Sequence, residues 1–190
     1  DKVAENNTGK TFVGFFSTTD EDAGETFTYK LVSGTGSQDN SSFSISKDSL
    51  YVTVSLNFEN KKEYYILVEA SDAGGKKITH PYVINVTDAN DQPTNLSLSN
   101  NVLKENNLKL ATVGNLSAAD EDASDTYSYT LISGTGGADN ASFAIAGNEL
   151  KINGAADYEV KNSYNVLIQV SDSNGAKFSK TFVIDITNAN

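Results

Sequence analysis

Carboxylates recur at short, regular spacings in this chain of 190 residues, and what they offer chemically is oxygen ligands for a cation. Asp20 and Asp22 lie two positions apart, as do Asp120 and Asp122, so an extended loop can turn both side chains of a pair to one side. Residues 88–93 read DANDQP and add two carboxylates and two carboxamides between two extended stretches. Calcium binds six to eight such oxygens with flexible geometry. Two carboxylates about 4 Å apart repel by about 4 kcal/mol at an effective dielectric near 20, and a divalent cation would reverse that term.

The same carboxylates allow two interpretations that involve no metal. The loops could be acidic because the whole chain is acidic, with 25 acidic and 14 basic residues and a net charge of -11. Carboxylate pairs also perform acid–base chemistry on glycosidic bonds, but that requires a cleft that raises their pKa values. The acidic residues here gather instead at strand ends and at the junction 88–93. We therefore predict a cation site and no enzymatic activity.

The composition argues against several classes of binding partner and site. Nucleic acids and anionic membrane surfaces need a basic face, which this chain lacks. It has no cysteine and one histidine, His80, so disulfides, thiol catalysis and cysteine or histidine metal sites are excluded. The sequence has no apolar run long enough to span a bilayer and no signal peptide, so we expect any export signal to lie outside it. The lack of disulfides in a chain of this kind favours a bacterial surface protein.

The chain consists of two copies of one sequence unit. A shift of 100 positions aligns the sequence with itself without a gap. The matching pairs are AENN with KENN, DEDA with DEDA, LVSGTG with LISGTG, DNSSFSI with DNASFAI, and YVINVTDAN with FVIDITNAN. We predict two domains, residues 1–91 and 92–190. The first begins out of phase, so we expect its N-terminal strand to be truncated.

Each repeat is filled with strand patterns. Apolar residues alternate with polar ones over 27–31, 50–56, 64–70 and 82–86, and at the corresponding positions of the second repeat. Short runs of period two, separated by Gly, Asn and Asp, indicate antiparallel strands with one buried face. We predict an all-β fold of two tandem, Greek-key, immunoglobulin-like sandwiches of about seven strands each.

The order of the acidic motifs resembles that of cadherin repeats, with the bacterial cadherin-like form the nearest. The residues that carry the resemblance are the xEN motif with Glu5 and Glu105, the DxD pairs, the DYE motif with Asp157 and Glu159, Asp72 and Asp172 near a strand end, and the exit motif D-A-N-D-x-P. Single motifs of this kind are weak, but five in the same order, twice, are fairly specific. The resemblance covers nearly the whole chain.

The resemblance implies calcium between successive repeats. Carried over residue by residue, the inter-repeat site would consist of Glu5, Glu59, Asp88, Asn90, Asp91, Asp120, Asp122 and Asp172. Partial sites would lie at the two far ends, formed by Asp20, Asp22 and Asp72 at one and by Glu105, Asp157 and Glu159 at the other. Position 57 is Asn where the second repeat has Asp157, and the exit motif is one residue shorter than the D-x-N-D-N-x-P of animal cadherins. We therefore expect one or two ions at the junction rather than three.

These observations predict an extracellular or cell-surface adhesin module that calcium stiffens, acting as a spacer, as an adhesive unit, or as both. Its partners would be calcium, adjacent repeats of the same chain, and another adhesin copy or a surface glycan or protein. The alternative is a cadherin-like module that binds carbohydrate, which an exposed aromatic platform shared by both repeats would favour. The sequence shows no such platform, because Tyr51 and Tyr65 correspond to Lys151 and Asn165.

Overall fold

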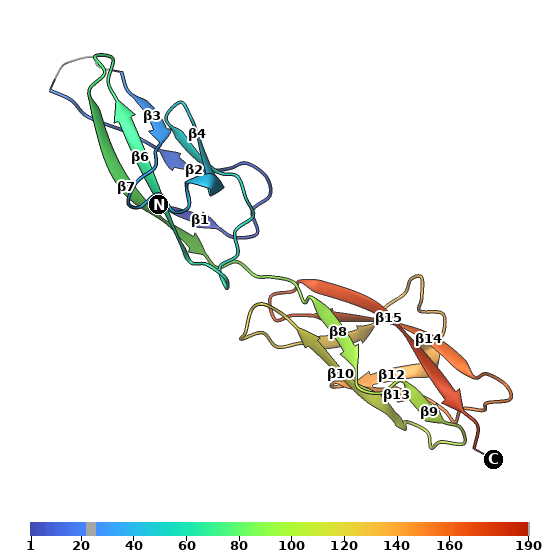
Figure 1. The fold of residues 1–190 in the computed structure, drawn as a ribbon. Helices are drawn as coiled ribbons and strands as arrows, with labels where there is room; N and C mark the ends of the chain where they lie inside the picture. Colours follow the sequence, from blue (N-terminus) through green and yellow to red (C-terminus); the bar gives the residue numbers. More distant parts are fainter. Residues whose placement is uncertain (22–25, 190) are drawn as a thin grey trace. The chain divides into compact units, whose positions relative to one another are not determined.

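The computed structural model describes residues 1–21 and 26–189. Two compact units are present, Asp1–Ala89 and Asn90–Asn190, and each is described by itself. Figure 1 shows that both are built of strands and the loops that connect them. Among the described residues, none form a helix with the length and hydropathy needed to cross a bilayer.

The first unit is a sandwich of two sheets. One sheet has the order β1-β7-β6-β3 and the other the order β2-β5-β4. Its described strands are β1 (Lys2–Ala4), β2 (Thr11–Phe15), β3 (Thr28–Leu31), β4 (Phe43–Ser46), β5 (Ser49–Val52), β6 (Glu63–Ser71) and β7 (Lys77–Thr87), with one 3₁₀ turn, η1 (Asn40–Ser42). β1 runs parallel to β7, and the other pairs are antiparallel.

The second unit repeats this plan with one additional strand. Its sheets have the orders β11-β14-β15-β9 and β12-β13-β10-β8. The elements are β8 (Asn95–Leu98), β9 (Val102–Lys104), β10 (Thr112–Ala119), β11 (Ser128–Leu131), η2 (Asn140–Ser142), β12 (Phe143–Ala146), β13 (Glu149–Ile152), β14 (Ser163–Ser171) and β15 (Lys177–Thr187). The chain leaves one sheet after β8 and joins the other at β9, which gives eight described strands where we expected about seven.

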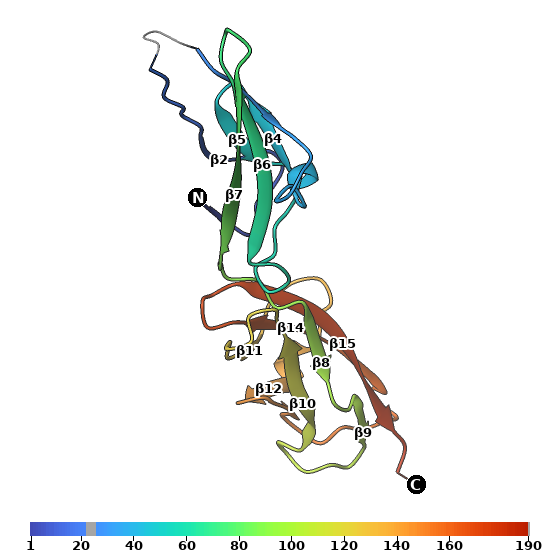
Figure 2. The same ribbon diagram turned by 60° about the vertical axis from the view of Figure 1, so that its left-hand side comes forward.

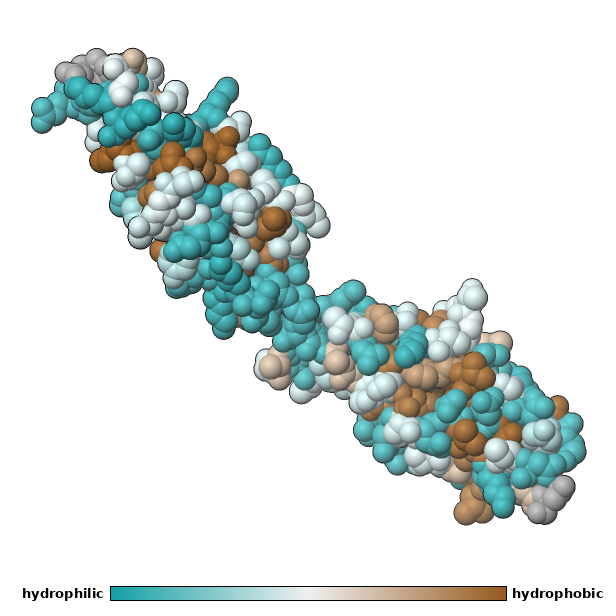
Figure 3. Space-filling model, in the orientation of Figure 1, coloured by the Kyte–Doolittle hydropathy of each residue, from teal (hydrophilic) through white to brown (hydrophobic). Residues whose placement is uncertain are grey.

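The predicted all-β fold is confirmed, and the alternation of apolar residues explains it. Ile66, Val68 and Ile84 in the first unit, and Val166 and Ile184 in the second, are at most 3% exposed and face the space between the sheets. Burying such side chains is the main favourable term in forming a sandwich of this size. Figure 3 shows hydrophobic residues surfacing in the middle of the visible face of each unit, among hydrophilic ones.

The glycine-rich loop of each unit covers the outward side of its long central strand. A side chain at Gly34 would place its Cβ 2.8 Å from Leu67 Cδ2, and Gly134 lies similarly close to Leu167. The side chain of Asn40 accepts a hydrogen bond from the Leu67 N–H at 3.0 Å. The two leucines on the outward face therefore pack beneath a loop.

A lysine and an aspartate anchor this loop in both units. In the second unit Lys161 forms an ion pair with Asp139, whose other oxygen accepts a hydrogen bond from the Asn165 N–H at 2.8 Å. The hydrogen bond from Lys161 lowers the pKa of the Asp139 carboxyl. The first unit has the same arrangement with Lys61, Asp39 and Tyr65.

Replacing Asp139 by Asn is expected to lower the free energy of unfolding by up to about 1 kcal/mol at pH 7, because it removes an ion pair whose lysine side chain is 42% exposed. The pKa of Asp139 is lowered in the folded state, so its contribution is present above the normal pKa of an aspartate and is lost as pH falls through the lowered value. Urea unfolding of wild type and variant from pH 7 to pH 3 measures the difference, with Asp185→Asn on β15 as the control. A difference that does not shrink on acidification would contradict this role of Asp139.

Candidate metal centres

Three carboxylates meet at the end of the first unit from which the chain leaves. Glu5 follows β1, Glu59 lies between β5 and β6, and Asp88 follows β7. One oxygen of each lies within 4.8 Å of the others. Two oxygens bound to one calcium ion lie at most about 5 Å apart, because each Ca–O bond is about 2.3–2.6 Å long. The group therefore meets the distance requirement of a single ion.

Glu5 is the buried member of this group and is held by the backbone. It is 3% exposed, and its Oε1 accepts a hydrogen bond from the Ala89 N–H at 2.8 Å. Its Oε2 accepts one from the Phe58 N–H at 2.5 Å. A single side chain thus fixes both the segment that carries Glu59 and the segment that carries Asp88.

Partial desolvation raises the pKa of Glu59, and the neighbouring charges of Glu5 and Asp88 add to the rise. A raised carboxyl pKa means that the ionised form is disfavoured where it stands. A bound cation would relieve this repulsion, so the charge distribution of the group favours a metal.

A second group of carboxylates lies near the beginning of the second unit. Asp120, Asp122 and Asp125 follow β10, and one oxygen of each lies within 4.8 Å of the others. Burial raises the pKa of Asp120, with a further contribution from the charges of Asp122 and Asp125. The Oδ2 atoms of Asp120 and Asp125 are buried and have no hydrogen-bond partner. Buried oxygens in that condition fit a role as metal ligands, because a buried charge without a partner is costly.

The first residues of the second unit attach to this group. The Asp91 N–H donates to Asp122 Oδ2 at 2.7 Å, and Asn90 Nδ2 donates to Asp172 Oδ2 at 3.0 Å. Asp172 is 7% exposed, and its Oδ1 accepts three backbone N–H groups from residues 174–176. The hydrogen bond from Asn90 lowers the pKa of Asp172, and these backbone donors add to the effect. Asp172 is therefore held ionised and in a fixed orientation.

The two far ends of the chain differ from each other. In the second unit Glu105, Asp157 and Glu159 form a group within 4.8 Å. Glu105 accepts hydrogen bonds from the N–H groups of Tyr158 and Ala189, at 3.0 and 2.7 Å, and these lower its pKa. In the first unit Asp20 and Asp72 line the same surface pocket, but they belong to no group of three carboxylates among the described residues. Asp22 lies outside the described residues.

The groups around Glu5 and Glu105 contain the same kinds of side chain, but at two positions the carboxylate and the carboxamide are interchanged between the units. In the first unit Asn57 stands where the second has Asp157, while Asp88 stands where the second has Asn188. The Asn188 amide donates to Glu159 Oε1 at 3.0 Å, so it too lies at the group. At these four positions each group thus has three carboxylates and one carboxamide. The first unit has its carboxamide at Asn57 and a carboxylate at Asp88, and the second unit has the reverse.

Two residues of the second unit's group were not among those predicted. Asp125 accepts a hydrogen bond from the Ser173 hydroxyl at 2.6 Å, and Asn174 donates to Asn90 Oδ1 at 2.6 Å. A signal for Asp125 was present in the sequence, because the corresponding position of the first repeat, residue 25, is also acidic. For Asn174 there was none, since residue 74 is Gly.

Replacing Asp120 by Asn is expected to have opposite effects with and without calcium. In chelator the variant should melt a few degrees higher than wild type, because it removes one charge from a mutually repelling group while keeping the Oδ1 that accepts the Asp122 N–H. With calcium it should melt lower, because a charged ligand is lost. Differential scanning calorimetry under both conditions measures the shift in melting temperature between variant and wild type. A shift of the same sign in both conditions would contradict a metal at this group.

Comparison with known proteins identifies the family of the chain. The profile of the family described as Cadherin domain matches residues 2–98. The chain is 27% identical to Protocadherin Fat 1 of Homo sapiens over 175 residues, 88% of this chain and 4% of the relative. It is 32% identical to Protocadherin Fat 4 of Mus musculus over 126 residues, 64% of this chain and 2% of the relative. The chain therefore spans only a few per cent of the length of the curated relatives it matches.

Solved structures show the same fold. "PcdhgB3 EC1-4" matches all of this chain and 47% of its own, with a TM-score of 0.66 and 24% identity. Human Protocadherin-24 EC1-2 covers 96% of this chain and 100% of its own, with a TM-score of 0.65 and 14% identity. A structure titled "Protocadherin gammaB7 EC3-6 cis-dimer" covers all of this chain and 45% of its own, with a TM-score of 0.55 and 22% identity.

Cadherin domains are extracellular adhesion modules that depend on calcium, and the predicted extracellular or cell-surface location is confirmed. The match over residues 2–98 extends over more than half of the 190 residues. This chain belongs to the cadherin domain family.

Proposed function

We propose that the chain is a spacer and adhesion module that calcium stiffens, with calcium bound where the two units join. The proposed ligands are Glu5, Glu59, Asp88, Asn90 through its carbonyl oxygen, Asp91, Asp120, Asp122 and Asp172, and we add Asp125 to this set. Each unit gathers its own share of these residues, and all of them supply oxygen, the donor that calcium prefers.

The observation that carries the proposal is the division of the linker between the two groups. Asp88 belongs to the group of the first unit, while Asn90 and Asp91 bond to Asp172 and Asp122 of the second. Only Ala89 separates them along the chain. Consecutive Cα atoms are about 3.8 Å apart. Linker residues that belong to the second group therefore follow within a few residues of those that belong to the first.

The mechanism that follows is mechanical. Without calcium the two acidic groups repel each other and themselves, and the linker is free to bend. With calcium, oxygens from both units and from the linker share the same ion or ions, so bending would require breaking metal–ligand contacts. With Asn at position 57 and Asp at position 88, the first group has three carboxylates, which supports one or two ions.

Small-angle X-ray scattering of the whole chain in calcium and then in chelator tests the proposal. We expect the profile of a rigid pair in calcium and a broader distribution of dimensions in chelator. Asp122→Asn should resemble the chelated state at calcium concentrations that order the wild type, while Asp185→Asn on β15 should behave as wild type. Superimposable wild-type curves in the two conditions would overturn the proposal.

The identity of an adhesive partner is also a proposal. The relative titled as a cis-dimer supports a second copy of this kind of chain as one partner. The carbohydrate-binding alternative has no support from the comparisons, and the named relatives are from animals, so a bacterial origin is not supported either. Analytical ultracentrifugation in calcium and in chelator measures any self-association of the chain.

A further inference from the structure

Two asparagines of the second unit, Asn153 and Asn174, are each followed directly by a glycine. In such a pair the glycine nitrogen can attack the side-chain carbonyl carbon of the asparagine, because glycine has no side chain that hinders the approach. The new N–C bond closes a succinimide ring, while the bond to Nδ2 breaks and ammonia leaves with the proton of the glycine N–H. Water then opens the ring to aspartate or isoaspartate, so a neutral carboxamide becomes a carboxylate.

Asn153 is fixed to the body of its sheet. It follows β13 and is half-buried, and its Nδ2 donates hydrogen bonds to the carbonyl oxygens of Ala141 and Phe143, both at 3.0 Å. Its own N–H donates to the Ser142 carbonyl at 2.8 Å. Phe143 belongs to the core cluster, so turning the Asn153 side chain towards the next nitrogen requires a core element to open. Openings of that kind have free energies close to that of global unfolding.

The contacts of Asn174 lie instead at the end of the unit. Asn174 and Gly175 are exposed in the loop between β14 and β15. Figure 2 shows that β15 begins at the same end of the second unit as β8. The Gly175 N–H, which carries the attacking nitrogen, donates to Asp172 Oδ1 at 2.6 Å, and Asn174 Nδ2 donates to Asn90 Oδ1 at 2.6 Å. Both bonds must break before the ring can close, but none of these residues belongs to the core cluster.

From this difference we infer that Asn174 is a site of spontaneous deamidation, and that its conversion weakens the attachment of the linker to the second unit. The product has no N–H to donate to Asn90 Oδ1, so two oxygens would face each other where a hydrogen bond now lies. The new charge would also lie beside Asp125, whose Oδ1 is 3.5 Å from Asn174 Nδ2. Asp125 already shares its loop with the carboxylates of Asp120 and Asp122, so the added charge is repelled.

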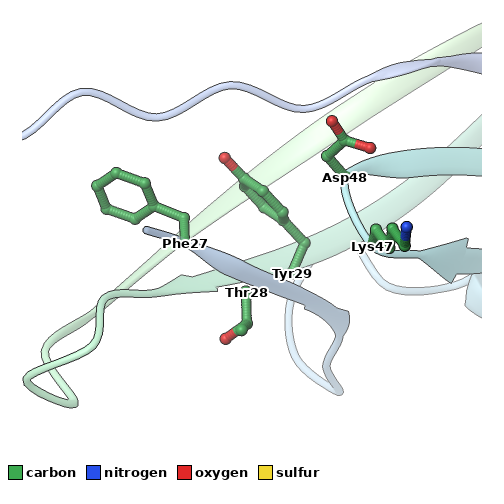
Figure 4. A pocket seen from close by; sticks show the side chains of 5 residues that line it. All are labelled: Phe27, Thr28, Tyr29, Lys47 and Asp48. Atoms are coloured by element: carbon green, nitrogen blue, oxygen red, sulfur yellow. The ribbon is translucent and has the colours of Figure 1, made fainter. Parts of the chain in front are cut away.

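The first unit offers no equivalent site. It has no Asn–Gly pair, and Gly74 stands where the second unit has Asn174. The same ring could form at Asp48, which precedes the small Ser49, and Figure 4 shows its carboxylate beside the pocket that Phe27 and Tyr29 also line. An ionised carboxylate is a much poorer electrophile than a carboxamide, and Asp48 Oδ1 also accepts a hydrogen bond from the Ser49 hydroxyl at 3.0 Å. We therefore expect the reaction in the second unit.

The inference goes beyond the proposed function, and its test uses the whole chain in chelator, so the outcome does not depend on calcium binding. Trypsin cleaves after Lys151, Lys161 and Lys177, which places Asn153 and Asn174 on different peptides. Mass spectrometry follows the conversion of each asparagine during incubation. In urea the two should convert at similar rates, because both precede glycine. In the folded chain Asn153 should convert at least about tenfold more slowly than Asn174.

Asn90→Ala tests whether the linker protects Asn174. It removes the oxygen that holds Asn174 Nδ2, so conversion at Asn174 should become about two- to tenfold faster, the effect of one hydrogen bond on the opening of the loop. Conversion at Asn153 should not change, and the acceleration should disappear in urea. The matched control is Asn115→Ala at an exposed position of β10, which should change neither rate.

Asn174→Asp reproduces the aspartate product and tests its consequence. In chelator this variant should melt a few degrees lower than wild type, because it loses the bond to Asn90 and adds a charge beside Asp125. Asn115→Asp adds the same charge away from the group and should melt as wild type does. Equal rates at Asn153 and Asn174 in the folded chain, or no acceleration in Asn90→Ala, would overturn the deamidation site. An Asn174→Asp chain that melts no lower than wild type would overturn the weakened attachment.

Discussion

Removing calcium is expected to lower the melting temperature of this chain by about 10–20 °C. One site held at about 100 times its dissociation constant stabilises the folded state by about 2.7 kcal/mol, and 1 kcal/mol shifts the melting temperature of a domain of this size by about 4–8 °C. Because the proposed ligands come from both units, the thermal unfolding transitions of both units should shift to lower temperature when calcium is removed. Differential scanning calorimetry with calcium and with chelator measures the shift.

Magnesium is the matched control for this experiment. It demands near-octahedral geometry with shorter bonds and gives up its water reluctantly. Carboxylates fixed by backbone hydrogen bonds, as Asp172 and Glu5 are, would not adjust to that geometry. Magnesium at the same concentration should therefore restore little of the lost stability. Equal melting temperatures in calcium and chelator would contradict the site.

Replacing Glu5 by Ala is expected to cost roughly 2–4 kcal/mol of unfolding free energy even in chelator. The change leaves the N–H groups of Phe58 and Ala89 without their acceptors in a site where Glu5 itself is 3% exposed. Hydrogen bonds to charged groups contribute about 1.5–3 kcal/mol each. Urea unfolding in chelator measures this loss separately from any loss of calcium binding.

Glu5→Gln separates the two roles of this residue. Gln keeps one oxygen acceptor of nearly the same shape, so it should be destabilised less than Ala in chelator. It removes the charge, so calcium titration by calorimetry should still show weaker binding. If Glu5→Ala were as stable as wild type without calcium, the hydrogen bonds of Glu5 would not position the linker. Glu105→Ala should shift stability in the same direction, because Glu105 has the same two backbone partners in the second unit.

The fold was predictable because two independent patterns agreed. The offset of 100 residues defined the repeat, and the alternation at residues such as Tyr64, Ile66 and Val68 defined strands with one buried face. Packing then required a second sheet, because a sheet with one apolar face has to bury it. The switch of the chain from one sheet at β8 to the other at β9 was not predictable, since three polar residues between two short strands give no indication of which sheet each strand joins.

The residues of the candidate sites could be proposed from the sequence, but how each side chain is held in place could not. Spacing and the family resemblance pointed to Glu5 and Asp172, and the structure shows how the backbone holds them, which depends on segments far apart in the sequence. The predicted boundary after residue 91 remains a prediction, although the compact units divide at residues 89 and 90. Asp125 was missed because only the folded loop brings its carboxylate within 4.8 Å of those of Asp120 and Asp122.

The parallel pairing of β1 with β7 and of β9 with β15 has a consequence under tension. Lys2–Ala4 pairs with Asn85–Thr87, and Val102–Lys104 pairs with Asp185–Thr187. Pulling the two ends of a unit apart slides one strand along the other, so the hydrogen bonds between them carry the load together rather than one after another. The bond from the Ala89 N–H to the Glu5 carboxylate lies at the end of this pair and carries the same load. A unit built in this way resists stretching by loading its parallel strand pair in shear.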